Sequence, residues 1–176
     1  MARKTIETLA WILPRPRMNR RYIGGFPLWF EQKIMKLYDN PEKVLHPFGG
    51  MAEYGIRVDL NKDVDPDVIA DAHHLPFKDN VFDMVILDPP YSNELSKSMY
   101  GTGKIVYKQY AKEAVRVCKN NGFVVVYHYK MLPRPIGTIY HRRILLAVRI
   151  NHHLRYVGIF QKSKIIMIKT KIMKEN

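Results

Sequence analysis

The feature that most constrains the fold is an apolar run of four residues that two prolines stop. Met84-Val85-Ile86-Leu87 is followed at once by Asp88-Pro89-Pro90-Tyr91. A short run rich in branched residues predicts a buried strand of a parallel sheet, and the prolines end it in a rigid turn. In an open α/β sheet, ligands bind beyond the carboxyl ends of such strands. This turn therefore places a carboxylate and an aromatic ring where a ligand site is expected.

The residue types in the turn suit a flat ligand that carries an amino group. Asp88 and the carbonyls of Asp88 and Pro89 can accept hydrogen bonds from an exocyclic NH2, and Tyr91 can stack against a ring. A simple strand-to-loop corner is the alternative interpretation, because Asp-Pro-Pro is also favourable turn chemistry. The rest of the chain has to decide between the two.

Three more apolar runs end in residues that suit a nucleoside site. Val44-Leu45-His46 leads into a Gly49-Gly50 turn, where the missing side chains let the backbone approach a ligand. The next two runs end in Asp59 and Asp71. In such a sheet, an acid after the second strand accepts hydrogen bonds from both ribose hydroxyls, and this is the role expected for Asp59. The alternative is that Asp59 only stabilises a turn or caps a helix. Three strand-terminal acids behind a glycine loop form the strongest argument in the sequence.

The joint pattern resembles the class I S-adenosylmethionine-dependent methyltransferases, in particular the amino-methyltransferases that methylate adenine N6 or cytosine N4. Asp88-Pro89-Pro90-Tyr91 resembles their catalytic motif, and residues 47–50 and 71–77 resemble their cofactor-binding segments. The resemblance covers about residues 25–170 and implies S-adenosylmethionine as the cofactor. It implies that Asp88, Pro89, Pro90 and Tyr91 are catalytic, and that the cofactor is held by Phe26, Pro47, Phe48, Gly49, Gly50, Asp59, Leu60, Asp71, Ala72, His73, Leu75 and Asp88.

Two features depart from the family pattern. His46 stands where the family usually has an acidic residue. Only residues 51–54 separate the glycines from the next strand, whereas a parallel crossover usually needs a dozen or more residues and a helix. We therefore expect the first crossover helix to be shortened or missing.

The expected fold is α/β and Rossmann-like, with a mostly parallel sheet of seven strands that ends in an antiparallel hairpin. Helices are predicted over residues 27–38, 105–119 and 137–149, with a buried strand over 123–127. The hairpin is predicted from strands over 154–161 and 164–170. Residues 1–24 are interpreted as a basic N-terminal arm, and residues 25–176 as a single methyltransferase domain.

The net charge of +13 is distributed unevenly along the chain. Residues 44–99 carry 4 basic and 10 acidic side chains, whereas residues 100–176 carry 16 basic and 2 acidic ones. This clustering suggests a surface that meets nucleic acid, with DNA favoured over RNA; solubility alone is the alternative. The expected phosphate contacts are Arg15, Arg17, Arg20, Arg21, Lys130, Arg134, Arg142 and Arg143, although the first four also fit a solvated terminus.

Several classes of protein are excluded by composition. The single cysteine, Cys118, leaves no disulfide within the chain and no cysteine cluster for zinc, and the two pairs of adjacent histidines lack a third ligand, so no metal is expected. No apolar run reaches membrane-spanning length, and the N-terminus lacks a signal-peptide pattern. We expect a soluble cytoplasmic protein without a membrane partner.

Three functions remain open at this point. The first is a DNA adenine-N6 or cytosine-N4 methyltransferase, the second an RNA base methyltransferase, and the third a catalytically idle nucleic-acid-binding protein with the same fold. DNA methyltransferases with defined sites usually carry a target-recognition domain, for which 176 residues leave no room. Either the sequence specificity is low, or a protein partner supplies it, or the substrate is recognised by its shape.

Overall fold

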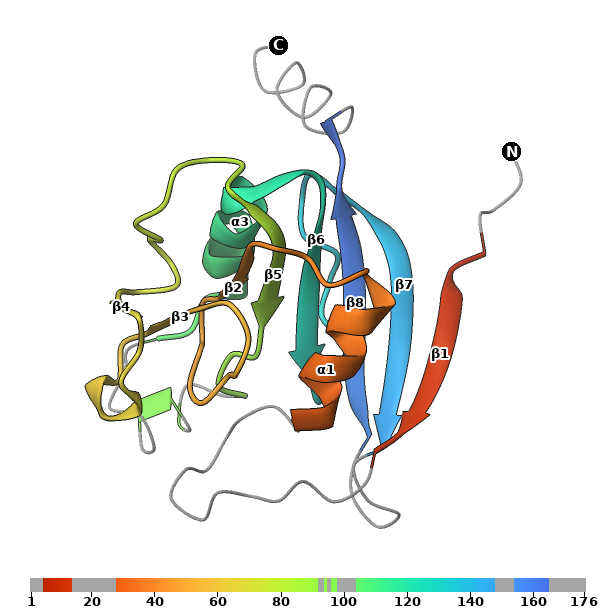
Figure 1. The fold of residues 1–176 in the computed structure, drawn as a ribbon, viewed down its shortest axis with the longest axis horizontal. Coiled ribbons are helices and arrows are strands. Elements are labelled where there is room, and N and C mark those ends of the chain that lie inside the picture. Colours follow the sequence, from red (N-terminus) through yellow and green to blue (C-terminus); the bar gives the residue numbers. More distant parts are fainter. Residues whose placement is uncertain are drawn as a thin grey trace.

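A sheet of eight strands, in the order β1-β7-β8-β6-β5-β2-β3-β4, organises the molecule (Figure 1). The computed structural model describes residues 5–13, 28–91, 94, 96, 97, 104–147 and 154–164. All neighbouring strands are parallel except β8, which is antiparallel to β6 and β7. The strands are β1 (Glu7–Ile12), β2 (Val44–His46), β3 (Ile56–Asp59), β4 (Val68–Ile69), β5 (Phe82–Leu87), β6 (Cys118–His128), β7 (Thr138–Ala147) and β8 (Arg155–Lys162). The predicted α/β class, a mostly parallel sheet ending in an antiparallel pair, is confirmed.

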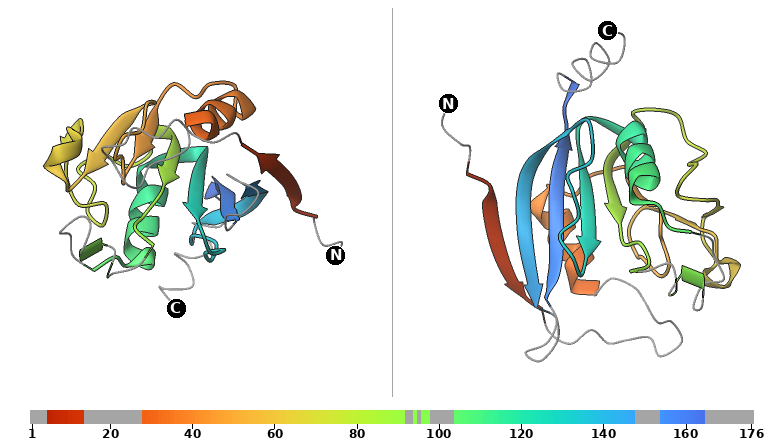
Figure 2. Two further views of the ribbon diagram at one scale, coloured as in Figure 1. Left: turned by 90° about the horizontal axis from the view of Figure 1, so that it is seen from below. Right: turned by 180° about the vertical axis from the view of Figure 1, so that it is seen from behind.

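Two helices cover opposite faces of the sheet (Figure 2). Helix α1 (Leu28–Leu37) and helix α3 (Tyr107–Val117) confirm the predictions over 27–38 and 105–119, and a 3-10 turn, η1 (Lys62–Val64), follows β3. Phe30 and Ile34 of α1 are fully buried against one face, and Ala114 of α3 is fully buried against the other. Among the described residues, no helix is both long and apolar enough to cross a lipid bilayer.

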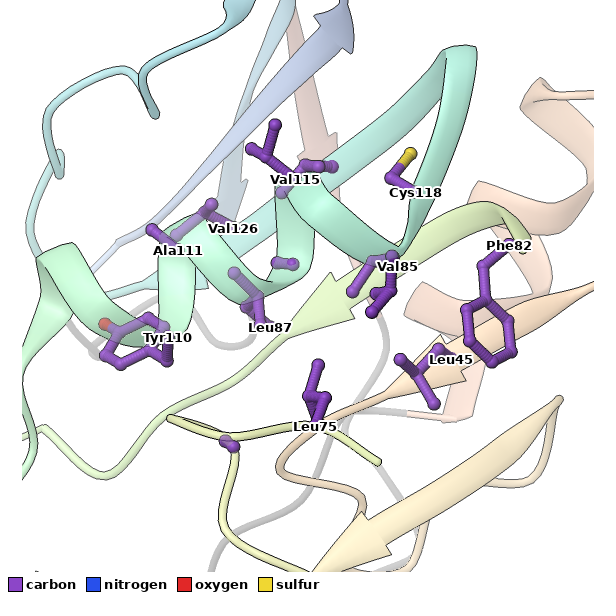
Figure 3. Packing of buried hydrophobic residues seen from close by; sticks show 14 of the residues in the cluster. Leu45, Leu75, Phe82, Val85, Leu87, Tyr110, Ala111, Val115, Cys118 and Val126 are labelled. Carbon is purple, nitrogen blue, oxygen red and sulfur yellow. The ribbon is translucent and has the colours of Figure 1, made fainter. Parts of the chain in front are cut away.

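The packing under α3 holds the central strand rigidly. Val85 and Leu87 of β5 are fully buried in the cluster that Figure 3 shows, with Leu87 near Ala111 of α3 and Val85 nearer its Cys118 end. Leu45 of β2 extends the same cluster on the other side of β5. Because a close-packed interior leaves these side chains little freedom, the turn that follows Leu87 starts from a fixed point.

The connection between β2 and β3 contains no helix, as the short spacing predicted. Residues 47–55 form turns and return directly to the parallel strand β3. Gly55 has a φ of 77°, in the left-handed region, and a Cβ there would lie 2.4 Å from the Val44 carbonyl oxygen. Glycine is therefore needed at this position, because any other residue would strain the turn and collide with β2.

The N-terminal segment differs from the expected arm, because residues 7–12 form the edge strand β1. It pairs in parallel with β7, from Glu7 opposite Arg142 to Ile12 opposite Ala147. Leu9 and Trp11 pack on the α1 side of the sheet, where the Trp11 and Phe30 rings lie 6.4 Å apart. The sheet therefore has eight strands rather than seven.

The predicted helix over 137–149 is wrong, because residues 138–147 form β7. Ile144 and Leu146 are fully buried on one face, and the strand pairs with β1 on one side and β8 on the other. The antiparallel hairpin therefore consists of β7 and β8, with the predicted 154–161 strand as its second member. Most of the other predicted member, 164–170, lies outside the described residues.

Candidate active site

The polar strand ends predicted from the sequence meet at one edge of the sheet, the lower edge in Figure 1. Strands β2 to β6 run parallel, so their carboxyl ends point to this edge. Asp59 is the last residue of β3, Asp88 follows β5, and Asp71 follows β4 by two residues. The antiparallel strand β8 starts at the same edge with Arg155.

Asp59 and the glycine turn are joined directly. Gly50 N–H donates to Asp59 Oδ2 over 3.0 Å, and Asn61 N–H donates to Oδ1 over 2.9 Å. A Cβ at Gly49 would lie 2.6 Å from the Arg57 Cβ, so this glycine is required by packing against β3. Each carboxylate oxygen of Asp59 keeps a second lone pair for a ligand. Asp59 and the glycine turn could therefore bind the ribose of a nucleoside.

Asp71 is oriented by its neighbour His73. His73 N–H and Nδ1–H both donate to Asp71 Oδ1, over 2.9 and 2.6 Å, while His73 Nε2 accepts from Val106 N–H over 3.0 Å. Partial burial acts to raise the pKa of Asp71, but the hydrogen bonds from His73 outweigh it and hold the pKa below its usual value. Asp71 is therefore a carboxylate with one oxygen fixed and the other turned towards His74, 4.0 Å away.

The segment after Asp71 is held by two charged residues of α3. Leu75 N–H donates to Glu113 Oε2 over 2.9 Å, and Arg116 donates to the Leu75 carbonyl over 2.9 Å and to Glu113 over 2.7 Å. Among the other predicted cofactor residues, Pro47, Ala72 and Leu75 are buried, Phe48 packs edge-on against Tyr110, and Leu60 is exposed. Phe26 lies outside the described residues.

The Asp-Pro-Pro-Tyr turn lies among rings and one cation. Burial raises the pKa of Asp88 to about 7, and the nearby Arg155 opposes that rise. The Tyr91 ring lies 5.2 Å from the His128 ring and 5.1 Å from the Tyr129 ring, and the Arg155 guanidinium lies over it at 5.3 Å. Such a set can bind a flat, hydrogen-bonding ligand between Asp88 and the aromatic side chains.

Three of these residues were missed from the sequence: His128, Tyr129 and Arg155. The first two follow the buried strand that was predicted over 123–127, and a parallel neighbour of β5 brings them to the Asp88 edge. That signal was available in the sequence. Arg155 was missed because a helix was wrongly predicted over 137–149. That error placed the start of the hairpin, and with it the direction of the strand that begins at Arg155, incorrectly.

Beneath the glycine turn lies a buried pair of titratable side chains. His46 is fully buried, and its Nε2 lies 3.6 Å from Oε1 of Glu31, which α1 supplies and which is 2% exposed. Glu31 Oε2 accepts from Glu53 N–H over 3.4 Å. Burial raises the pKa of Glu31 to about 7 and lowers that of His46 to about 4. A buried carboxyl group from α1 thus lies next to His46.

The predicted phosphate contacts fall into distinct surroundings. Lys130 is exposed, with its Nζ 5.0 Å from the Tyr129 ring centroid, and Arg143 lines a hollow beside it. Arg134 donates to the Thr138 carbonyl, and Arg142 Nε donates to Glu7 over 2.6 Å, so both also hold local structure. Arg15, Arg17, Arg20 and Arg21 lie outside the described residues.

Solved structures with the same architecture include methyltransferases. TrmN from Thermus thermophilus has a TM-score of 0.58 at 18% identity, over 82% of this chain and 51% of that chain. The N-methyltransferase NodS from Bradyrhizobium japonicum WM9 has a TM-score of 0.53 at 8% identity, over 78% and 98%. The 1,6-didemethyltoxoflavin-N1-methyltransferase from Burkholderia thailandensis, solved with 1,6-didemethyltoxoflavin and S-adenosylhomocysteine, has a TM-score of 0.55 at 9% identity, over 76% of each chain.

These likenesses identify the class I methyltransferase fold. This chain spans about half the length of TrmN. No protein-family model matches the sequence, and neither does any curated protein.

Proposed function

We propose that this chain transfers a methyl group from S-adenosylmethionine to the exocyclic amine of a nucleobase in nucleic acid. The observation that carries the proposal is the placement of Asp88 and Tyr91 at the edge where the glycine turn, Asp59 and Asp71 also lie. The hydrogen-bond acceptor Asp88 and the Tyr91 ring therefore lie at the same edge as the residues that could bind a nucleoside. DNA, at adenine N6 or cytosine N4, is the first substrate to test, and an RNA base is the second.

The residues present fit the proposed cofactor. The Gly49-Gly50 turn brings backbone to the site, Asp59 offers oxygens for ribose hydroxyls, and Asp71 offers its second oxygen for an adenine amino group. Bound S-adenosylmethionine supplies an activated methyl group on a sulfonium, so the protein is left mainly with binding and orientation.

Asp88 and Tyr91 then orient the amine. The Asp88 carboxylate and the Pro89 carbonyl accept the two N–H groups, which aims the nitrogen lone pair and keeps its electron density available. Tyr91 stacks on the base and fixes its plane. A base held in a duplex cannot reach such a turn, so the target is either unpaired or flipped out of its stack.

One side chain near Asp88, that of Arg155, favours its charged form. Burial raises the pKa of Asp88 to about 7, whereas the positive charge of Arg155 opposes this rise. An ionised Asp88 accepts from the amine, and a protonated one loses part of that capacity. Arg155 is therefore a positioning residue for the acceptor.

The test is transfer of labelled methyl from S-adenosylmethionine to DNA and, in parallel, to bulk RNA. Wild type is compared with Asp88→Ala, and with Asp63→Ala as a control, because Asp63 is an exposed acid outside the Asp-Pro-Pro-Tyr turn. We expect label in the nucleic acid that disappears in Asp88→Ala alone, and nucleoside analysis that shows N6-methyladenine or N4-methylcytosine. Label only in RNA selects the RNA base methyltransferase.

Cofactor binding separates the remaining alternative. If neither substrate is labelled and calorimetry detects no binding of S-adenosylhomocysteine, the catalytic proposal is wrong. The chain is then a nucleic-acid-binding protein with an idle methyltransferase fold. If the cofactor binds but neither substrate accepts the methyl group, the nucleobase part of the proposal is wrong.

A further inference from the structure

On the α3 side of the sheet, no described helix covers the face over β7 and β8. Helix α3 packs against β5 and β6, and the connection from β6 to β7, residues 129–137, contains no helix. The view from behind in Figure 2 shows this loop passing beside β7 and β8, with α3 on the other side of β6. Within the described residues, this part of the face is covered only by that loop.

Cross-strand neighbours on β6, β8 and β7 form this face. In one rung, Val126 of β6 lies opposite Gly158 of β8, which lies opposite Arg143 of β7. One rung nearer the Asp88 edge, His128 pairs with Tyr156. Gly158 has no side chain, and the Phe160 ring lies over it; a Cβ there would be 2.7 Å from that ring.

The β7–β8 groove is the shallow hollow between these strands and the 129–137 loop, with a free volume of about 10 Å³. Tyr140 and Tyr156 give it aromatic walls, and its charged lining residues are Lys130 and Arg143. None of its lining residues is a carboxylate. The groove therefore combines rings with positive charge, the combination that single-stranded nucleic acid binds.

The groove is continuous with the candidate active site. The Tyr91 ring contacts the His128 ring at 5.2 Å, and His128 lies beside Tyr156 across the strands. On the other side, Tyr91 contacts Tyr129 at 5.1 Å, and the Tyr129 ring is contacted by Lys130 of the groove. A chain of aromatic and basic residues thus runs from the Asp-Pro-Pro-Tyr turn into the groove.

We propose that the β7–β8 groove binds a single-stranded polynucleotide, and that the strand passes from it to a target base held at Tyr91. This proposal rests on the proposed function for the identity of the target. The strand next to the target lies with its bases against Tyr129 and Tyr156 and its phosphates towards Lys130 and Arg143.

Charge selects this occupant over others. The protein carries a net charge of +13, so a second copy is repelled from a basic groove. Residues 165–176 of the chain itself carry 3 lysines and 1 glutamate, which also opposes their binding there. A lipid headgroup would use the cations but not the rings. Paired bases in a duplex would likewise leave the rings unused, because stacking platforms need unstacked bases.

The test measures binding without methyl transfer, so that it is independent of catalysis. Fluorescence anisotropy of the full chain is recorded with a labelled 12-residue single-stranded DNA, the RNA of the same sequence and the corresponding DNA duplex. The groove variant is Lys130→Gln/Arg143→Gln. Its matched control is Lys36→Gln/Lys43→Gln, which removes two exposed charges at the opposite edge of the sheet, from the end of α1 and from the residue before β2.

For a single strand, each phosphate contact contributes about 0.7 to the slope of log Kd against log salt concentration. The groove variant is expected to lower that slope by about 1.4, and the control to leave it unchanged. Tyr156→Leu is expected to weaken single-strand binding at least about fivefold and duplex binding much less. Comparing the Kd values for the single-stranded DNA and the RNA of the same sequence shows which of the two the protein prefers. Circular dichroism melts confirm that each variant is folded.

Three results would overturn the proposal. The first is an equal loss of slope in the groove variant and the control. The second is single-strand binding that a folded Tyr156→Leu protein keeps in full. The third is tighter binding to anionic lipid vesicles than to either single strand, again unchanged in Tyr156→Leu. A chain that binds single strands through the groove but transfers no methyl group would leave this proposal standing and refute the proposed function.

Discussion

The Arg155 guanidinium lies over the Tyr91 ring, with its Cζ 5.3 Å from the ring centroid. This contact joins the first residue of β8 to the last residue of the Asp-Pro-Pro-Tyr turn. One face of Tyr91 is thereby occupied by a cation, which holds the ring in place. The same cation acts on Asp88, so Arg155 affects both the stacking surface and the acceptor.

Methyl transfer is expected to increase with pH through about 7, because burial raises the pKa of Asp88 to about that value and its charged form accepts from the amine. Arg155→Met should move the midpoint upwards by roughly one pH unit, since a nearby opposite charge lowers a carboxyl pKa by about that amount or more. Arg155→Lys, which keeps the charge, should move it much less. Initial rates at saturating cofactor between pH 5.5 and 9 measure both midpoints; equal midpoints in Arg155→Met and wild type would contradict the assignment.

Glu31 should make the protein less stable as the pH rises. Burial raises the pKa of Glu31 from 4.5 to about 7, so between these values the folded protein holds a proton that the unfolded chain has lost. The free energy of unfolding therefore falls across that range. At pH 8, urea titration should give Glu31→Gln a free energy of unfolding roughly 1–3 kcal/mol higher than that of wild type. At pH 4.5 the two proteins should differ little. The control is Glu42→Gln, at an exposed position. If Glu31→Gln and wild type differed in stability by the same amount at both pH values, the raised pKa of Glu31 would not be the cause.

Asp59 should be needed for cofactor binding. Its carboxylate fixes Gly50 over 3.0 Å and is placed to accept ribose hydroxyls, so Asp59→Ala removes both effects. Hydrogen bonds to a charged group contribute about 1.5–3 kcal/mol each, which predicts a Kd for S-adenosylhomocysteine that is roughly 10- to 100-fold higher. Calorimetry measures it. Asp63→Ala, which removes an exposed acid four residues away, should leave the Kd unchanged; a similar loss in both variants would point to general electrostatics.

Lys162 should stabilise the junction between α3 and β6. Its buried ammonium group donates to the Cys118 carbonyl over 2.7 Å, to Asn80 Oδ1 over 2.9 Å and to the Arg116 carbonyl over 3.2 Å. Lys162→Met keeps the length of the side chain but leaves these acceptors without their donor, which should lower the free energy of unfolding by about 1–3 kcal/mol. Lys164→Met, at an exposed position, should have no measurable effect in the same urea titration.

The strand-terminal acids could be predicted because each depends on a local signal. A short apolar run followed by an aspartate or a glycine turn marks the end of a parallel strand, and parallel strands bring their ends together. Asp59, Asp71 and Asp88 therefore reach one edge as predicted. The missing crossover helix also followed from the sequence, because only residues 51–54 separate the glycines from the next predicted strand.

The errors arose where pairing over long distances decided the structure. In β7 the register shifts between Tyr140 and Arg142, and such a bulge breaks the period of two that marks a strand. In β1 the alternation of Leu9, Trp11 and Leu13 is short and runs into a proline-arginine segment. The Glu31–His46 pair could not be predicted, because the packing of α1 under the glycine turn brings together residues 15 positions apart.

The position of β1 has a consequence for how the protein is made. Its partner β7 lies 135 residues later in the chain, as the pairing of Glu7 with Arg142 shows. During synthesis β1 leaves the ribosome well before β7, yet it cannot add to the sheet until residues 138–147 have emerged. Long-range pairing of this kind is slow, because a large loop has to close before any contact forms. This edge of the sheet is therefore completed late, by a strand that is made before all the others in the sheet.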